Sequence, residues 1–201
     1  LVGDRLFVTK YTYGYSKHSF PFSPPILNKR IMFSSPERGD VIVFKTPADN
    51  RTDYIKRIVG LPGDEIQFIE GDLFLNKRKT EKKEIYIKKN IFCGNKESNV
   101  TFYEENLANK KKYTIVYNSI GSMINSDKYT VPKNHYFLLG DNRDCSRDSR
   151  FLSSVGYVHE NNLVGKAQLI FFSSNYRKGR LFQFWKWFEI IRFDRFFKKI
   201  K

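Results

Sequence analysis

Several features that would point to common protein classes are missing from this sequence. No stretch approaches the ~20 consecutive apolar residues of a membrane-spanning helix, and no basic start leads into an apolar segment as in a signal peptide. The three histidines, His18, His135 and His159, are isolated, so no metal-ligand spacing exists. Phosphate loops, dinucleotide fingerprints and the Gly-x-Ser-x-Gly elbow are also absent. The residues given therefore predict no metal and no cofactor.

Cysteine is scarce and charge is abundant. Cys93 and Cys145 are far apart in the chain and establish no disulfide framework, so they do not reveal the compartment. The formal charge of +15 would attract nucleic acid or an anionic membrane. A proteome-wide bias toward Lys, Asn, Ile, Phe and Tyr explains the charge equally well. At 201 residues, one folded unit with an insertion is the default.

The fold class follows from many short apolar runs that are separated by turn signals, with little helical period. We therefore predict a mostly β, antiparallel fold. The expected strands are Leu6–Val8, Tyr11–Tyr13, Val41–Lys45, Tyr54–Val59, Ile66–Ile69, Leu73–Leu75, Tyr113–Tyr117, Tyr136–Leu139, Val155–Val158 and Leu163–Phe171.

One of these strands contains a lysine. The stretch from Tyr54 reads Tyr-Ile-Lys-Arg-Ile-Val-Gly-Leu-Pro-Gly-Asp, and the alternation of a strand places Lys56 on one face with Tyr54 and Ile58. Loss of solvent beside two large apolar neighbours would favour the neutral amine, which is a base, and the charge of Arg57 would act in the same direction. Taken alone, these residues fit an edge-strand lysine with its head in water better.

A polar loop follows the strand Tyr136–Leu139. It reads Gly-Asp-Asn-Arg-Asp-Cys-Ser-Arg-Asp-Ser-Arg over residues 140–150, with three Asp, three Arg and two Ser. Such a loop either is a solvated turn or pairs its charges internally and holds its backbone in one shape.

Together the two motifs resemble bacterial type I signal peptidase (leader peptidase). Earlier parts of the chain, including Gly3-Asp4 and Arg38 to Lys45, resemble the first boxes of that family in the right order, so the resemblance covers most of residues 1–171. It implies a β-rich catalytic domain with a second β subdomain inserted. We expect the core at residues 1–69 and 129–175, the insertion at 70–128 and a basic aromatic tail at 176–201.

The resemblance also implies roles for residues. Lys56 would be the general base of a Ser/Lys dyad that cleaves a peptide bond, and the hydroxyl of Ser146 would orient its nitrogen. The charged residues that would shape the site are Arg57, Asp141, Asp148 and Arg150. Cys145 replaces the commoner Asn of the last box, and because its neighbours match we interpret it as a tolerated substitution. It would be a free thiol near the site, which is a candidate for reactivity.

The nucleophilic serine of the family is not in this sequence. It belongs to a Ser-x-Ser-Met-x-Pro box that follows a membrane-spanning helix and supplies the oxyanion hole, and we expect that box ahead of Leu1. Ser122-Met123 imitates it but follows the lysine, so we assign it to a loop. A natural relative that has lost its nucleophile is the alternative.

Two further segments bear on partners. Lys77 to Asn90 carries seven basic residues and no interleaved aromatic ladder, which favours a solvated hairpin over a nucleic-acid surface. In the loop from Tyr15 to Asn28, apolar residues fit packing on the core or contact with lipid: Phe20, Phe22, Ile26 and Leu27.

The tail has a helical stripe of Phe184, Trp187, Phe188 and Ile191, followed by basic residues up to Lys201. This pattern fits a helix at the headgroups of a membrane and, equally, one docked on the protein itself.

The resemblance thus implies a peptidase that removes signal peptides from exported preproteins at the outer face of the bacterial inner membrane, with small residues before the cut. Its partners would be signal peptides and membrane lipid, with no nucleic acid. The competing hypothesis is a non-catalytic basic β module that binds a membrane surface or nucleic acid. A self-cleaving repressor with the same dyad is disfavoured because no helix-turn-helix pattern precedes the core.

Overall fold

The fold is mostly β and antiparallel, which confirms the fold class predicted from the sequence. The computed structural model describes residues 2–20, 27, 30–107, 111–118, 123–179 and 182–200, without the side chains of 86–89. In its largest sheet the strands run in the order β1 (Asp4–Thr9), β13 (Leu163–Ser173), β2 (Val41–Lys45), β3 (Asp53–Gly60), β11 (His135–Leu139) and β12 (Val158–His159), and β14 (Lys198–Lys199) also pairs with β13.

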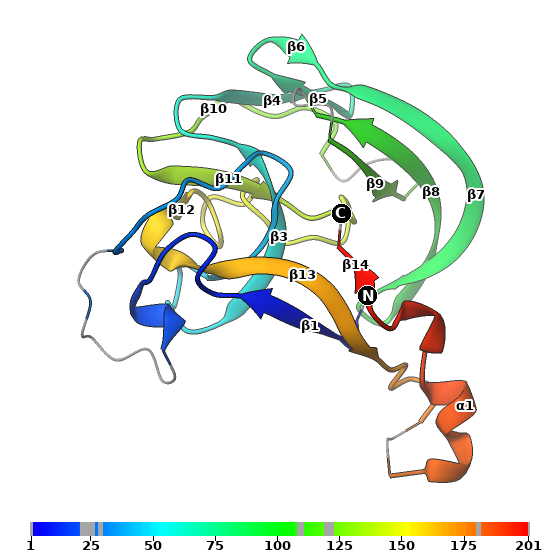
Figure 1. The fold of residues 1–201 in the computed structure, drawn as a ribbon. Helices are drawn as coiled ribbons and strands as arrows, with labels where there is room; N and C mark the ends of the chain where they lie inside the picture. The colour runs from blue at the N-terminus through cyan, green and yellow to red at the C-terminus, as the bar shows by residue number, and fades with distance from the viewer. Residues whose placement is uncertain are drawn as a thin grey trace.

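Two smaller sheets are built from the middle of the chain. One has the order β10 (Tyr129–Thr130), β4 (Glu65–Ile69), β5 (Asp72–Leu75) and β6 (Arg78–Lys79), and the other has β7 (Glu81–Cys93), β8 (Lys96–Asn106) and β9 (Lys112–Tyr117). Figure 1 shows β7 and β8 as a long curved hairpin along one side of the molecule. Short helical turns occur at η1 (Lys17–Ser19), η2 (Glu160–Asn162), η3 (Phe184–Lys186), α1 (Trp187–Ile190) and η4 (Phe193–Arg195).

Most expected strands form, but Tyr11–Tyr13 does not, and of Val155–Val158 only Val158 lies in a strand. The Gly14 N–H donates to the Tyr11 carbonyl at 3.0 Å, and Gly14 has φ +84°, a left-handed conformation that suits glycine. The chain therefore turns at this point. Tyr13 is buried, and its hydroxyl donates to Asp40 Oδ2 at 2.9 Å. The aromatic residues of this run therefore reflect the burial and hydrogen bonding of the Tyr13 side chain and not a strand.

The main sheet lies between two apolar cores. Alternate residues of β3 and β11 enter each core, because side chains of a strand alternate between faces. The first core contains Val59 and Phe137 with residues of β4, β5, β9 and β10, and the second contains Ile58 and Leu138 with residues of β2 and β13. β3 is thus an inner strand, packed on both faces.

The proposed division into core and insertion runs through the first apolar core. Its boundary at 69/70 falls in the turn between β4 and β5, which pair with each other. Ile66 and Phe137 of the core segments and Leu73 and Ile115 of the expected insertion belong to one buried cluster. The division into a core and an inserted subdomain stays a prediction.

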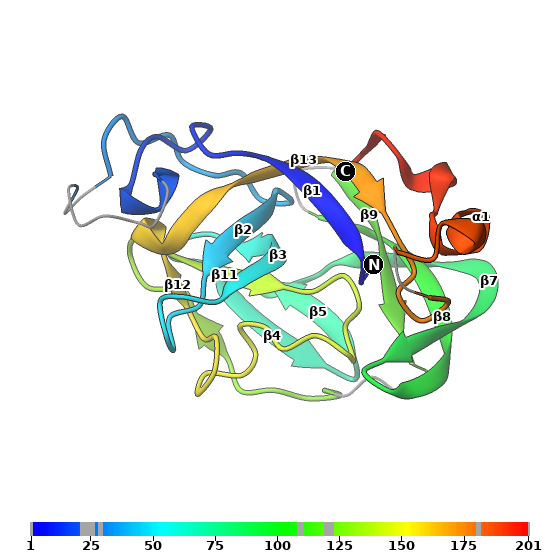
Figure 2. The ribbon, with the colours of Figure 1, turned by 90° about the horizontal axis from the view of Figure 1, so that it is seen from below.

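The tail forms a shorter helix than its period predicts. α1 ends at Ile190, which is fully buried, and Ile191 instead makes an antiparallel bridge with Ser174. Arg195 Nη2 lies 2.7 Å from Asp4 Oδ2. The tail is therefore docked beside the end of β13, as Figure 2 shows, while several of its aromatic rings stay exposed.

Three other expectations concern surface segments. The basic segment from Lys77 forms β6 and most of β7, where the described lysine side chains are exposed or half-buried. Phe20 is 41% exposed, whereas Phe22, Ile26 and Ser122 lie outside the described residues. Within the described chain, no helix is both long and apolar enough to cross a membrane.

We predict that Phe137→Ala lowers the free energy of unfolding by about 3–5 kcal/mol, because it removes a fully buried ring from the first core. Phe182→Ala is the matched control: its ring is 90% exposed, and we expect a change within about 0.5 kcal/mol. Urea unfolding followed by circular dichroism measures both, and equal effects would contradict the assigned core.

Candidate active site

Lys56 lies in the middle of β3, between β2 and β11, and not on an edge strand. It pairs with Ile42 of β2, and its Nζ lies 5.3 Å from the centroid of the Tyr54 ring. This contact confirms that Lys56 and Tyr54 share a face, the one packed against the second core. The side chain is half-buried, so the edge-strand alternative does not describe it.

The surroundings of Lys56 favour its neutral form. Burial lowers the pKa of the Lys56 ammonium below its ordinary value of 10.5, while the negative charges of Asp148 and Asp141 act against this shift and Arg150 adds to it. Arg57 is buried on the opposite face of β3. The polar loop thus supplies charges that act on the lysine from a distant part of the chain.

Asp148 organises the second half of that loop. Its carboxylate is fully buried and pairs with Arg150, whose Nε and Nη2 donate to its two oxygens at 2.8 and 2.9 Å. The Gly140 N–H donates to Asp148 Oδ2 at 3.0 Å. Ser149 completes the closure, because its N–H donates to the Leu138 carbonyl and its Oγ accepts from the Leu138 N–H. The loop is therefore an internally paired structure and not a solvated turn.

Arg57 and Asp141 form a second pair, at the start of the loop. Nε and Nη2 of Arg57 each donate to the Asp141 carboxylate at 2.8 Å, and Nη1 donates to the Gly39 carbonyl at 2.8 Å. The guanidinium also lies 4.0 Å from the centroid of the Tyr113 ring. This bidentate geometry fixes where β11 passes into the loop.

Ser146 packs against Gly140, which follows the end of β11. The last residue pair between β11 and β3 joins Leu139 to Arg57, the direct neighbour of Lys56. A Cβ on Gly140 would lie 1.9 Å from Ser146 Oγ, so only glycine lets the serine approach this closely. Ser146 Oγ is buried and has no hydrogen-bond partner within the described part of the chain. A buried donor without a partner is rare and marks a site where another group could bind.

The middle of the loop is held by a residue that the sequence did not single out. Arg143 is almost completely buried and pairs with Glu105 of β8, to which its Nη1 donates at 3.0 Å. β9 holds the same stretch through its backbone: Val116 N–H donates to the Asp141 carbonyl at 2.8 Å, and Arg143 N–H donates to the Val116 carbonyl at 2.9 Å. The segment expected as an insertion thus forms one wall of the loop.

Comparison with known protein families gives a match over most of the chain. Residues 1–172 match the protein family described as signal peptidase, peptidase S26. The chain belongs to this family. The resemblance inferred from the two motifs is therefore confirmed, and the family match also spans the expected insertion at 70–128.

Among the relatives of this chain is signal peptidase I of Rickettsia typhi. It is 36% identical over 217 residues, which cover 100% of this chain and 80% of that protein. Signal peptidase I of Rickettsia bellii is 36% identical over 219 residues, which cover 100% of this chain and 73% of the relative. A crystal structure of a signal peptidase I from Enterococcus faecalis aligns with 66% of this chain and 97% of its own, at 25% identity and a TM-score of 0.39.

The free thiol that we expected in this signal peptidase family chain does not exist. Cys145 is joined to Cys93 in a disulfide with a Cα–Cα distance of 5.5 Å, and neither cysteine is free. Nothing in the sequence indicated this pairing, since the two cysteines stand 52 positions apart and nothing near either one points to its partner.

We predict that Glu105→Gln destabilises the protein by about 3–5 kcal/mol, because it leaves the Arg143 charge buried without its counter-ion. The neighbour Glu104 provides a matched control: it pairs with Lys112 at 3.0 Å on the surface, and Glu104→Gln should cost less than about 1 kcal/mol. Urea unfolding of both variants tests this, and similar costs would show that the buried pair does not hold the loop.

Proposed function

We propose that the protein is a membrane-associated serine endopeptidase that removes signal peptides from exported preproteins, with Lys56 as its general base. The observation that carries this proposal is a desolvated lysine on an inner strand, beside an internally paired loop, in a chain of the signal peptidase family. A lysine accepts a proton near neutral pH only when its surroundings disfavour its charge.

The proposed chemistry is a two-step acyl transfer. Neutral Lys56 removes the proton of a serine hydroxyl, whose oxygen attacks the scissile carbonyl carbon. The protonated lysine then donates to the leaving amine, and water hydrolyses the acyl-enzyme with Lys56 again as base. The nucleophile would be a serine from a segment ahead of Leu1. That segment would also supply the oxyanion hole.

Ser146 would orient the Lys56 nitrogen. Its buried and unpartnered Oγ supports this role, because a hydroxyl can accept from the ammonium and donate to the neutral amine. The pairs Arg57–Asp141 and Asp148–Arg150 would act as scaffold, since each fixes one end of the loop that carries Ser146.

The substrate and the compartment follow from the same proposal. Small pockets around the dyad would favour residues such as alanine one and three positions before the cut, because larger side chains would overlap the walls. The catalytic domain would lie at the outer face of the bacterial inner membrane. The disulfide supports an oxidising compartment, where such bonds persist.

The competing function is a non-catalytic basic module that binds nucleic acid or lipid, for example through the lysines of β6 and β7. Such binding would weaken strongly with salt and would not depend on Lys56.

We predict that Lys56→Ala lowers kcat for preprotein cleavage by at least about 10²–10⁴-fold, because it removes the general base. The assay uses the full-length protein in detergent with a preprotein that has an Ala-x-Ala site. Lys45→Ala, in the adjacent strand with its Nζ 2.9 Å from Asp53, is the control and should cleave normally. Normal cleavage by the Lys56→Ala variant would contradict the proposed mechanism.

We further propose that the tail contacts the membrane surface. Phe182 and Phe188 are 90% and 91% exposed, Trp185 is 65% exposed, and the exposed Lys178 and Lys198 occur in the same tail. Exposed aromatic rings with neighbouring cations suit the headgroup region of an anionic bilayer.

The double variant Phe182→Ser/Phe188→Ser should bind vesicles that contain phosphatidylglycerol about tenfold or more weakly. It lacks the two aromatic rings that would be transferred from water to the membrane on binding. Sedimentation of the protein with vesicles measures this binding. Ile124→Ser is the control, because Ile124 is 49% exposed but lies beside the turn between β4 and β5. Equal loss in both variants, or none in the double variant, would contradict a tail-specific contact.

A further inference from the structure

The residues just before the Asp148–Arg150 pair have few connections to the rest of the protein. Residues up to Asp144 are held by β9 and by Glu105, and residues from Asp148 onward are held by β11. Between these anchors lie Cys145, Ser146 and Arg147. Their described hydrogen bonds to side chains amount to a long one of 3.4 Å from the Cys145 N–H to Asn142 Oδ1, which is within the loop. The disulfide is therefore the link that ties this stretch to a distant element.

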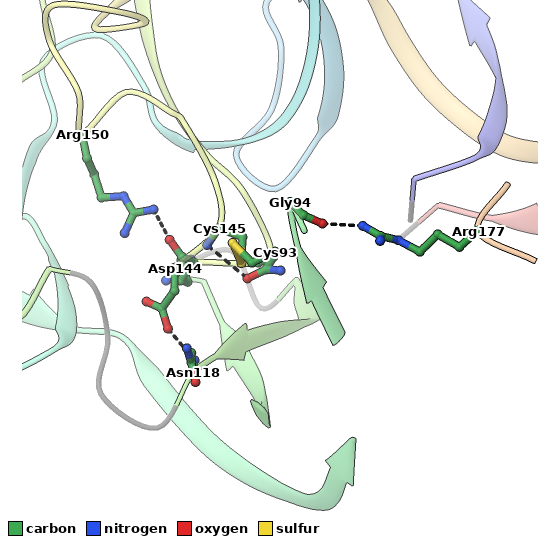
Figure 3. The surroundings of a disulfide bond; sticks show 9 residues. Cys93, Gly94, Asn118, Asp144, Cys145, Arg150 and Arg177 are labelled. Carbon is green, nitrogen blue, oxygen red and sulfur yellow. Dashed lines mark hydrogen bonds between the residues drawn. A yellow bond between two sulfur atoms is a disulfide. The ribbon is translucent and has the colours of Figure 1, made fainter. Parts of the chain in front are cut away.

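The other half of the disulfide is at the tip of the β7–β8 hairpin. Cys93 is the last residue of β7 and pairs with Lys96 across the turn. Arg177, in the segment after β13, holds this tip from the opposite side: it donates to the Gly94 carbonyl, and its guanidinium lies 4.1 Å from the centroid of the Phe92 ring. Figure 3 shows the tip between Arg177 on one side and Cys145 on the other.

This arrangement matters because Ser146 directly follows Cys145 and has no spare room. Its Oγ is packed against Gly140 at the end of β11, in the loop whose Asp148 charge acts on Lys56, and has no described hydrogen-bond partner that would keep it there. A shift of about 1 Å is enough to misplace a catalytic hydrogen bond. The stretch that carries the hydroxyl therefore needs a rigid tether, and the disulfide supplies one from the hairpin tip.

We propose that the Cys93–Cys145 disulfide positions the Ser146 hydroxyl toward Lys56, so that Cys93 of the β7–β8 hairpin is a positioning residue for peptide-bond cleavage. The inference rests on the proposed function. Cleavage then requires an oxidised protein: a disulfide acceptor takes two electrons and two protons from the two thiols, and a dithiol reductant returns them and breaks the S–S bond.

The first measurement is peptide mapping of the full-length protein, purified from an oxidising compartment, without reduction. A disulfide-linked pair of peptides that contain Cys93 and Cys145 is expected. Two free thiols in the active enzyme would overturn the proposal.

The second measurement is cleavage kinetics of wild type and Cys93→Ser, with and without a dithiol reductant. We expect reduction to lower the kcat of wild type at least tenfold, with KM within about twofold, and reoxidation to restore it. Cys93→Ser should have the low kcat under both conditions. An unchanged kcat after complete reduction would overturn the proposal.

The pH profile separates positioning from a general loss of folded protein. When Ser146 moves away, water reaches Lys56 and relieves its desolvation, so the acid limb of kcat/KM should move to higher pH in Cys93→Ser. If instead the activity falls only in proportion to the fraction of unfolded protein, and the acid limb of kcat/KM stays at the same pH, the disulfide has a purely structural role. Lys56→Ala in the same assay keeps the two proposals apart. If oxidised wild type cleaves, Lys56→Ala does not, and reduction changes nothing, only the inference about the disulfide fails.

Discussion

The buried carboxylate of Asp148 is the constraint on which the site depends most. A fully buried charge is costly unless it is paired and hydrogen-bonded, and Asp148 meets this requirement through Arg150 and the Gly140 N–H. Satisfying one carboxylate therefore closes the loop onto the end of β11. Since β11 pairs with β3, the same closure places the loop beside Lys56.

The desolvation of Lys56 is a second consequence of this packing. An inner strand with apolar cores on both faces leaves little room for water, and the carboxylates nearest to the lysine are engaged by arginines. Asp148 pairs with Arg150, and Asp141 pairs with Arg57. The negative charges that would stabilise the ammonium are thus partly neutralised, so burial determines the direction of the shift. The paired charges shape the loop, and they leave the lysine with the lowered pKa that the proposed base requires.

The β7–β9 sheet contributes to the site as a wall. It supplies Glu105 to Arg143, the backbone of Val116 to the start of the loop, and Cys93 to Cys145. These contacts come from three different strands. The segment that the sequence suggested as a separate subdomain is therefore continuous, in packing and in bonding, with the loop that it supports.

The sequence by itself determined the alternation of strands and turns, the strand position of Lys56 and the polar character of the loop, because these depend on local spacing. It did not reveal Glu105 as the partner of Arg143 or Cys93 as the partner of Cys145, since a local pattern holds no information about a residue 38 or 52 positions away. The helical period of the tail was present, yet the helix ends at Ile190 because contacts with Ser174 and Asp4 redirect the chain. Only the tertiary structure decided these features and the lowered pKa of Lys56, because desolvation and pairing depend on which distant segments pack together.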